Sequence, residues 1–174
     1  FLDADYEWYF SSVEGNVYLK LPENENPETS EIVVPFAESL IQIKGNENKP
    51  IKNIHFEGIT FRHCNWQIPD GGYCGVQACY IDARPKSGWT EIPSAIKVEW
   101  AESCSFTNCA FENLGASGVW LSTACQSCSI KNSHFNDISG NGIMIGEGRD
   151  RFIDGEVWWQ KAPEQVAKSN TIEN

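Results

Sequence analysis

Basic side chains are scarce in this sequence of 174 residues. It has 13 Lys and Arg residues against 24 Asp and Glu residues, so that its formal net charge is -11 and its isoelectric point is near 4.6. A surface with this charge repels the phosphate backbone of nucleic acids, and no cluster of Lys or Arg offsets the excess. We therefore expect no nucleic-acid partner.

Long apolar runs are also missing. No run approaches the roughly 18 apolar residues that a membrane-spanning helix needs, so we expect no membrane span. The sequence opens on apolar and aromatic residues and contains no positively charged, apolar leader. The last residues, from Ser169 to Asn174, begin a pattern that occurs twice earlier. We expect the chain to be a fragment of a longer domain that continues beyond Asn174.

Paired metal-binding cysteines are absent. Of the seven cysteines, only Cys125 and Cys128 have the spacing of a zinc-site pair, and no second pair accompanies them. No phosphate-binding loop and no Ser/His/Asp order can be picked out. The sequence therefore predicts neither a metal site nor a cofactor.

An internal repeat of about 24 residues is the strongest positive signal. Segment 103–122 matches segment 127–146 without a gap, and partial copies begin at Asn53 and Ser169. Each copy holds short alternating apolar runs separated by Gly, Asn and Asp, which is typical of short strands. We predict an all-β fold, a right-handed parallel β-helix built as a solenoid of these repeating rungs.

Stacking the copies predicts columns of inward side chains about 4.8 Å apart. The clearest columns are Phe56, Phe106, Ile130 and Ile172; Phe61, Phe111 and Phe135; Leu114 and Ile138; Val119 and Ile143; and Leu121 and Ile145. Asn108, Asn132 and Asn174 also align, which predicts a ladder of buried asparagines.

The chain divides into two parts by pattern. Residues 1–30 predict a β-hairpin around Gly15 and Asn16, followed by a polar lead-in segment. Residues 31–174 predict the rungs of the β-helix, the first of them running through Glu31 to Pro35, with loop insertions at 62–94 and 147–168.

Chemistry in a filled solenoid has to lie on its outer face or in its insertions. Aromatic rings beside carboxylates fit carbohydrate, because flat rings stack on sugars and a carboxylate pair supplies an acid and a base or nucleophile. The candidate catalytic residues are Asp137, Glu147 and Asp150. The candidate substrate-binding residues are Trp66, Trp89, Glu99, Trp120 and Trp158, of which Glu99 and Trp120 should share one outward face with Lys97 and Met144.

Each candidate also has a structural interpretation. Asp137 falls at a rung corner, where aspartate commonly bonds turn amides. Loop tryptophans often cap the open edge of a solenoid or pack on the next rung. Asp150 and Asp154 flank Arg149 and Arg151 and can pair with them on the surface.

Several runs resemble a family of bacterial right-handed parallel β-helix proteins. They are IHFEGITFRHCNW (54–66), CSFTNCAFENLG (104–115), GIMIGE (142–147) and the N-terminal segments 2–9 and 17–22. Many such proteins are similar to glycoside hydrolase family 141, described for fucosidase and xylanase activities. The resemblance covers nearly the whole chain and implies a polysaccharide or oligosaccharide substrate and a secreted or periplasmic location. It also implies further β-helix rungs C-terminal to Asn174, and it carries over no specific catalytic residue.

A polysaccharide-degrading glycoside hydrolase that uses a carboxylate pair is the leading prediction. In it, Asp137 or Glu147 would protonate the leaving oxygen while a second carboxylate acts as base or nucleophile. One alternative is a non-catalytic glycan-binding or adhesin β-helix. Another is a uronate polysaccharide lyase, which would need Ca²⁺ or a cation such as Lys97 or Arg149.

Overall fold

The structure is a computed structural model that describes residues 2–67, 81–82, 90–148 and 151–174. The chain forms two compact units, Phe1–Val34 and Pro35–Asn174. Each unit is described by itself.

The first unit contains an antiparallel hairpin of β1 (Trp8–Ser11) and β2 (Asn16–Leu19). The chain reverses at Gly15, whose φ of 70° lies in the left-handed region that glycine enters most easily. This is the hairpin predicted around Gly15 and Asn16. Residues 31–35, in contrast, form no strand, so the rung predicted there is wrong. Their branched apolar side chains imitate a strand, but Ile32, Val33 and Val34 are exposed and no neighbouring strand pairs with them.

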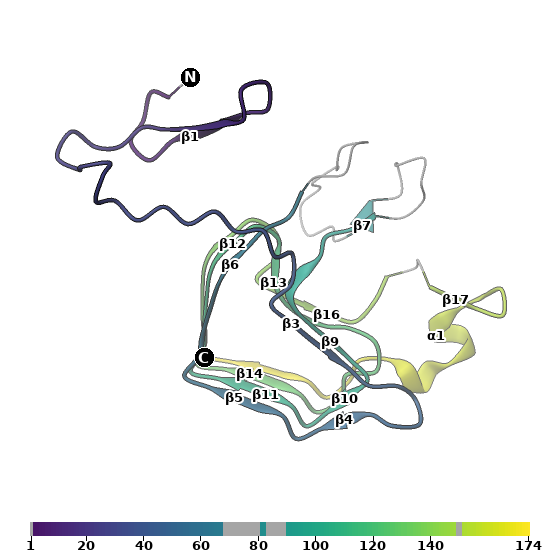
Figure 1. Cartoon of the computed structure of the whole chain (residues 1–174). Helices are drawn as coiled ribbons and strands as arrows, with labels where there is room; N and C mark the ends of the chain where they lie inside the picture. Colours follow the sequence, from purple (N-terminus) through teal and green to yellow (C-terminus); the bar gives the residue numbers. More distant parts are fainter. Residues whose placement is uncertain (1, 68–80, 83–89, 149–150) are drawn as a thin grey trace. The chain divides into compact units, whose positions relative to one another are not determined.

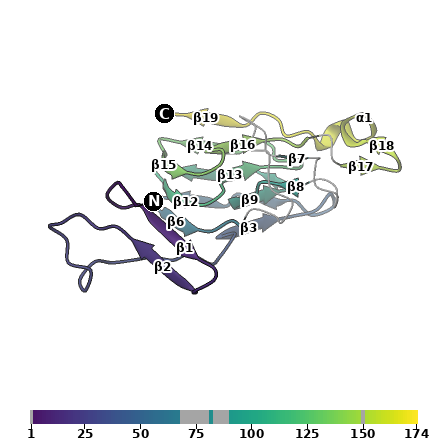
Figure 2. The ribbon, with the colours of Figure 1, turned by 90° about the horizontal axis from the view of Figure 1, so that it is seen from above.

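The second unit is a parallel β-helix with three larger sheets in its described part. One sheet joins β3 (Ile41–Lys44), β9 (Ser94–Glu99), β13 (Ser117–Leu121) and β16 (Ile143–Ile145). The second joins β6 (Thr60–Cys64), β12 (Ala110–Leu114) and β15 (His134–Ile138). The third joins β5 (His55–Glu57), β11 (Ser105–Thr107), β14 (Ser129–Lys131) and β19 (Thr171–Glu173). Seen along the solenoid, the sheets form the sides of a triangle (Figure 1), and equivalent strands lie above one another (Figure 2).

Shorter elements lie at the corners and in the insertions. Strands β4 (Ile51–Lys52) and β10 (Ala101–Glu102) pair in parallel at one corner. Strands β7 (Ile81–Asp82) and β8 (Thr90–Glu91) form an antiparallel pair in the first insertion. The second insertion contains β17 (Phe152–Ile153), β18 (Glu156–Val157), helix α1 (Trp158–Lys161) and the 3₁₀ turn η1 (Pro163–Gln165). No helix in the described residues is long and apolar enough to cross a membrane.

The strand register confirms the predicted columns. Phe106 pairs with Phe56 below and with Ile130 above, and Ile130 pairs with Ile172. The same holds for the column of Phe61, Phe111 and Phe135 and for the pairs Leu114 with Ile138, Val119 with Ile143 and Leu121 with Ile145. The repeat of about 24 residues is therefore one turn of the solenoid.

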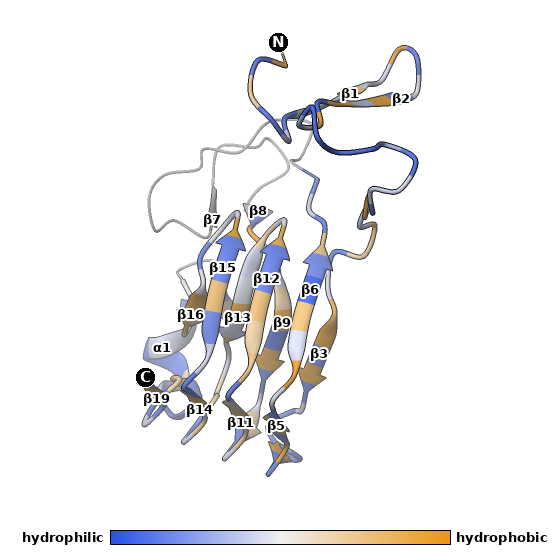
Figure 3. Ribbon diagram, turned by 90° about the vertical axis from the view of Figure 1, so that its left-hand side faces the viewer, coloured by the Kyte–Doolittle hydropathy of each residue, from blue (hydrophilic) through white to orange (hydrophobic). Residues whose placement is uncertain are grey.

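Stacked phenylalanine rings fill the interior. The ring centroids of Phe111 and Phe135 lie 4.5 Å apart, and those of Phe61 and Phe111 lie 5.2 Å apart, with the rings nearly parallel. Phe111 has no exposed surface. Figure 3 shows the alternation that permits this stack, since apolar and polar residues succeed each other along β6, β12 and β15. A strand period of two sends alternate side chains inward and outward.

The predicted ladder of buried asparagines is wrong. Asn108 and Asn132 are exposed, and each has a left-handed backbone, with φ of 52° and 46°. The equivalent residue one rung earlier is Gly58, with φ of 67°. Asparagine recurs at this corner because it tolerates the left-handed conformation that the turn between two strands requires, not because its amide is buried.

Five cysteines in the described part are free and buried: Cys64, Cys104, Cys109, Cys125 and Cys128. They serve as small apolar residues of the core. Burial raises the pKa of the Cys64 thiol to about 11 and also raises the pKa values of Cys125 and Cys128. These thiols therefore stay protonated in the folded protein at neutral pH.

Candidate functional site

One outer side of the solenoid is the outward face of the sheet formed by β3, β9, β13 and β16. Because side chains alternate along β9, Ile96 points into the core and Lys97 points out. Lys97 pairs in register with Trp120, and Trp120 pairs with Met144. The expectation that Lys97, Trp120 and Met144 share one face of neighbouring rungs is therefore confirmed.

A pocket of about 270 Å³ opens on this face, and we call it the sheet-face pocket. It lies between the segment that leads into β3, the end of β8, and the outward side chains of β9 and β13. Its polar and aromatic lining includes Glu38, Gln42, Glu91, Ser94, Lys97 and Trp120. Segments far apart in the sequence thus meet around one concave surface.

The ammonium group of Lys97 belongs to the lining of the sheet-face pocket. Its Nζ lies 3.4 Å from Oε2 of Glu91 and 3.9 Å from Oε1 of Glu99, and 4.2 Å from the centroid of the Trp120 ring. Glu99 also pairs with Lys44 across the strands, at 3.4 Å. Two carboxylates and the ring face attract the same cation, which holds it in place although it is partly removed from water.

Trp120 is the floor of the pocket rather than an open platform. The residue is 2% exposed, and its indole N–H donates a hydrogen bond of 2.7 Å to the carbonyl oxygen of Gly146. Lys97 lies above the ring. A sugar entering the pocket would therefore meet Lys97 and Glu91 before it could stack on Trp120.

Glu147 is tied to Arg151 by a two-point ion pair. Arg151 Nε donates to Oε1 of Glu147 at 2.8 Å, and its second terminal nitrogen donates to Oε2 at 2.7 Å. The same guanidinium donates to Oε1 of Gln165 at 2.8 Å and lies 4.8 Å from the ring centroid of Trp158. Both oxygens of Glu147 are thus occupied, and the network anchors the second insertion on itself.

Trp158 belongs to this network and not to the sheet-face pocket. It is 4% exposed, and its indole N–H donates a hydrogen bond of 2.7 Å to the carbonyl oxygen of Gly148. Its ring meets that of Trp159 edge-on, with centroids 5.7 Å apart. The residue therefore packs the insertion, which is the structural interpretation that loop tryptophans allow.

Asp137 lies at a corner of the rungs. It is exposed, has a left-handed backbone with φ of 53°, and accepts a hydrogen bond of 2.9 Å from Nδ2 of Asn113. Asn113 and His63 have the same backbone conformation at the equivalent corners below. The contact of Asp137 thus joins one corner to the next.

The remaining candidates are scattered. Trp66 is half-buried just beyond the end of β6, and Glu99 lies at the end of β9, where it pairs with Lys44 and Lys97. Asp150 and Trp89 lie outside the described residues. The structure thus brings Glu99 and Trp120 to the same ammonium group and places Glu147 with Trp158 in a separate network. The catalytic role of each acid stays a prediction.

The two described acids of the pocket, Glu38 and Glu91, are not among the residues that the sequence singles out. Both come from connecting segments outside the repeat, so aligning the copies of the repeat cannot locate them. The only signal for Glu91 was its position just before Pro93 and the apolar strand that follows. In the described part of the chain, no group of three or more His, Cys, Asp or Glu side chains is placed to hold a metal ion.

Comparison with known proteins identifies the architecture. The family described as a right-handed β-helix region matches residues 37–156. A solved structure titled "Glycoside hydrolase" aligns with a TM-score of 0.72 and 30% identity, covering 84% of this chain and 28% of that one, so the chain spans little more than a quarter of that protein. No curated protein matches the chain. The family match extends over most of the described rungs, and the chain belongs to the right-handed β-helix family.

Proposed function

We propose that the chain is part of a glycoside hydrolase that acts on a polysaccharide outside the cytoplasm. The likeness to the glycoside hydrolase structure carries this proposal, because it combines 30% identity with the same fold over 84% of the chain. Fold alone would support it less, since unrelated activities occur on one fold. Membership of glycoside hydrolase family 141, which the sequence resembles, stays a prediction.

The sheet-face pocket supplies a place for one sugar unit. Sugar hydroxyl groups need both donors and acceptors of hydrogen bonds, and the pocket offers the ammonium of Lys97, the carboxylates of Glu38 and Glu91 and the amide of Gln42. A glycosidase needs two carboxylates on either side of the scissile bond. Among the described acids, Glu38 and Glu91 line one pocket together, and we propose them as the first pair to test.

The charges favour a neutral sugar over a uronate. Lys97 lies close to Glu91 and Glu99, and Glu38 adds a further negative charge, so that acids outnumber lysines among the described residues in and around the pocket. A uronate polymer would add its own carboxylates to this site. A lyase would also need its base or cation free, whereas Lys97 is already paired. The lyase is therefore the weaker candidate.

The first experiment compares sugar release from neutral hemicelluloses and from polygalacturonate, with and without EDTA. We expect reducing ends from a neutral glycan, unaffected by EDTA, and no unsaturated products from polygalacturonate. Glu91→Gln should lower the rate about 100-fold or more if Glu91 is the acid or base. Lys131→Met is the matched control, because Lys131 forms a similar ion pair with Glu173, at 2.9 Å, in a different sheet.

The other outcomes separate the alternatives. Unsaturated, EDTA-sensitive products from polygalacturonate would establish the lyase. Binding without release would establish a non-catalytic glycan-binding β-helix. If Asp137→Asn abolishes release and Glu91→Gln does not, the acid lies at the corner of β15 and our choice of carboxylates is wrong.

A further inference from the structure

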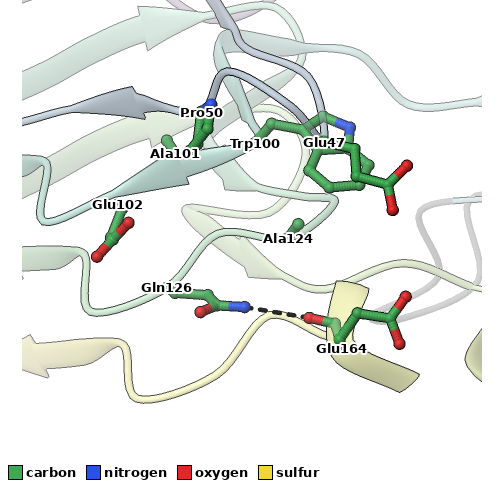
Figure 4. A pocket seen from close by; sticks show the side chains of 8 residues that line it. All are labelled: Glu47, Pro50, Trp100, Ala101, Glu102, Ala124, Gln126 and Glu164. Carbon is green, nitrogen blue, oxygen red and sulfur yellow. Dashed lines mark hydrogen bonds between the residues drawn. The ribbon is translucent and has the colours of Figure 1, made fainter. Parts of the chain in front are cut away.

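A second pocket lies at the corner of the solenoid where β9 turns into β10, and we call it the corner pocket. Its volume is about 150 Å³, which is below the roughly 300 to 1,000 Å³ of sites for drug-sized ligands. Trp100, Glu47, Glu164 and Gln126 line it. Figure 4 shows the Trp100 ring and the carboxylates of Glu47 and Glu164 on one side of the pocket, with Glu102 at the other. This volume suits the ring of a single sugar unit.

The backbone of this corner does not require a tryptophan. Trp100 has a left-handed backbone with φ of 52°, which is uncommon for a bulky residue. In the next rung the equivalent residue is Ala124, with φ of 51°; each stands two positions before the bridged pair Glu102 and Gln126. Since alanine makes the same turn, the indole at residue 100 is not needed to form it. The ring is half-buried and faces the pocket.

The polar groups of the corner pocket suit hydroxyl groups. Gln126 directs its amide nitrogen to the backbone oxygen of Glu164, at 3.1 Å, which joins the solenoid to η1. Glu102 pairs with Lys52 at 2.5 Å, away from the indole. The exposed carboxylates of Glu47 and Glu164 lie on the side of the ring and can accept hydrogen bonds. A flat ring beside acceptors matches the apolar face and hydroxyl rim of a sugar.

The corner pocket lies just beyond the end of β9, the strand that carries Lys97. Lys97 lines the sheet-face pocket and Trp100 lines the corner pocket, three residues further on, which is about 10 Å at 3.3 Å per residue. Glu99, whose side chain also points out, stands between them. Two units of one glycan chain, separated by at least one further unit, can therefore occupy the two pockets.

We propose that the corner pocket is a second sugar subsite, in which Trp100 stacks on a unit of the same neutral glycan chain that occupies the sheet-face pocket. This inference rests on the proposed function. It implies that affinity depends on the length of the oligosaccharide, because short oligosaccharides fill one pocket, whereas longer ones gain the contact with Trp100.

The test is calorimetric titration of the protein with neutral oligosaccharides of increasing length, taken from the glycan that it binds. Trp100→Ala should weaken the binding of long oligosaccharides about 10-fold and leave a disaccharide unchanged. Ala124 indicates that the variant folds, and thermal unfolding checks this. Glu164→Gln, which keeps the side-chain shape, should weaken only the long ligands as well. Phe152→Ala, at an aromatic residue that is 58% exposed outside both pockets, is the control.

The outcomes separate the two proposals. Equal affinity of Trp100→Ala and the unaltered protein for every length would overturn the subsite and leave the proposed function intact. Equal weakening for short and long ligands would also overturn it. If Trp100→Ala weakens long ligands while Lys97→Met and Glu91→Gln change nothing, the corner pocket binds glycan without the sheet-face pocket, which overturns the proposal that one chain occupies both. Absence of binding by any neutral glycan would overturn both.

Discussion

The stacked phenylalanines and two of the tryptophans lie on opposite sides of the rungs. Phe61, Phe111 and Phe135 stack ring against ring inside the solenoid. Trp120 and Trp158 lie outside this core, and the indole N–H of each donates to a backbone carbonyl. A phenyl ring has no donor and can be buried in a dry column, whereas an indole needs a partner. The inside of the solenoid is therefore built by repetition and the outside by individual contacts.

The largest expected effect comes from breaking the inner column. Phe111→Ala removes a fully buried ring that touches rings in both neighbouring rungs, and we expect it to lower the free energy of unfolding by about 3 to 5 kcal/mol. Urea unfolding followed by circular dichroism measures this. Phe152→Ala, at an exposed ring, should cost less than about 0.5 kcal/mol. A loss below about 1 kcal/mol for Phe111→Ala would contradict the importance of the stack.

A smaller effect should follow from breaking the outer network. Glu147→Gln removes the charge that meets Arg151 at two points, with the Glu147 side chain only 11% exposed, and should destabilise the protein by about 1.5 to 3 kcal/mol. Hydrogen exchange should show the loss first in the second insertion. Lys131→Met breaks a more exposed pair and should cost less than about 1 kcal/mol. Equal effects of the two variants would mean that the outer network is no more than a surface ion pair.

The smallest effect concerns the buried thiols and appears only at high pH. The pKa of Cys64 rises from 9.0 to about 11 on folding, so between these pH values the unfolded chain binds fewer protons than the folded one. Stability therefore falls as pH rises through this window, by roughly 1 kcal/mol at pH 10 for this group. Unfolding measured from pH 8 to 11 tests this. Cys64→Ala should show a shallower decline, and an unchanged slope would refute the assignment.

The periodicity of the sequence predicts which residues fill the interior of the solenoid, but it does not predict the contacts on its outer surface. The columns through Phe106, Phe111 and Leu121 follow from counting residues, because one rung repeats the strand alternation of the last. Counting also aligns the asparagines, but the role predicted for them, a buried ladder, is wrong. Asparagine is favoured both at a corner that needs a left-handed backbone and in a ladder that needs a buried amide. Spacing alone does not separate them.

The candidate site shows the same limit. Counting placed Lys97 and Trp120 on one outward face, and the register agrees. It could not show that Lys97 would cover the ring of Trp120, or that Arg151 would occupy both oxygens of Glu147. Nor could it bring Glu38 and Glu91 to the same pocket, since both lie in connections that do not repeat.

The sequence by itself determined the solenoid, the length of its rung and the residues that fill its interior, because stacking identical rungs forces equivalent residues into contact at strand spacing. Only the tertiary structure decided which acids are paired, which aromatic rings are covered and where the outer surface is concave. Those features depend on short-range contacts between side chains that are far apart in the sequence. The segments involved do not repeat, so the periodic pattern does not predict their contacts.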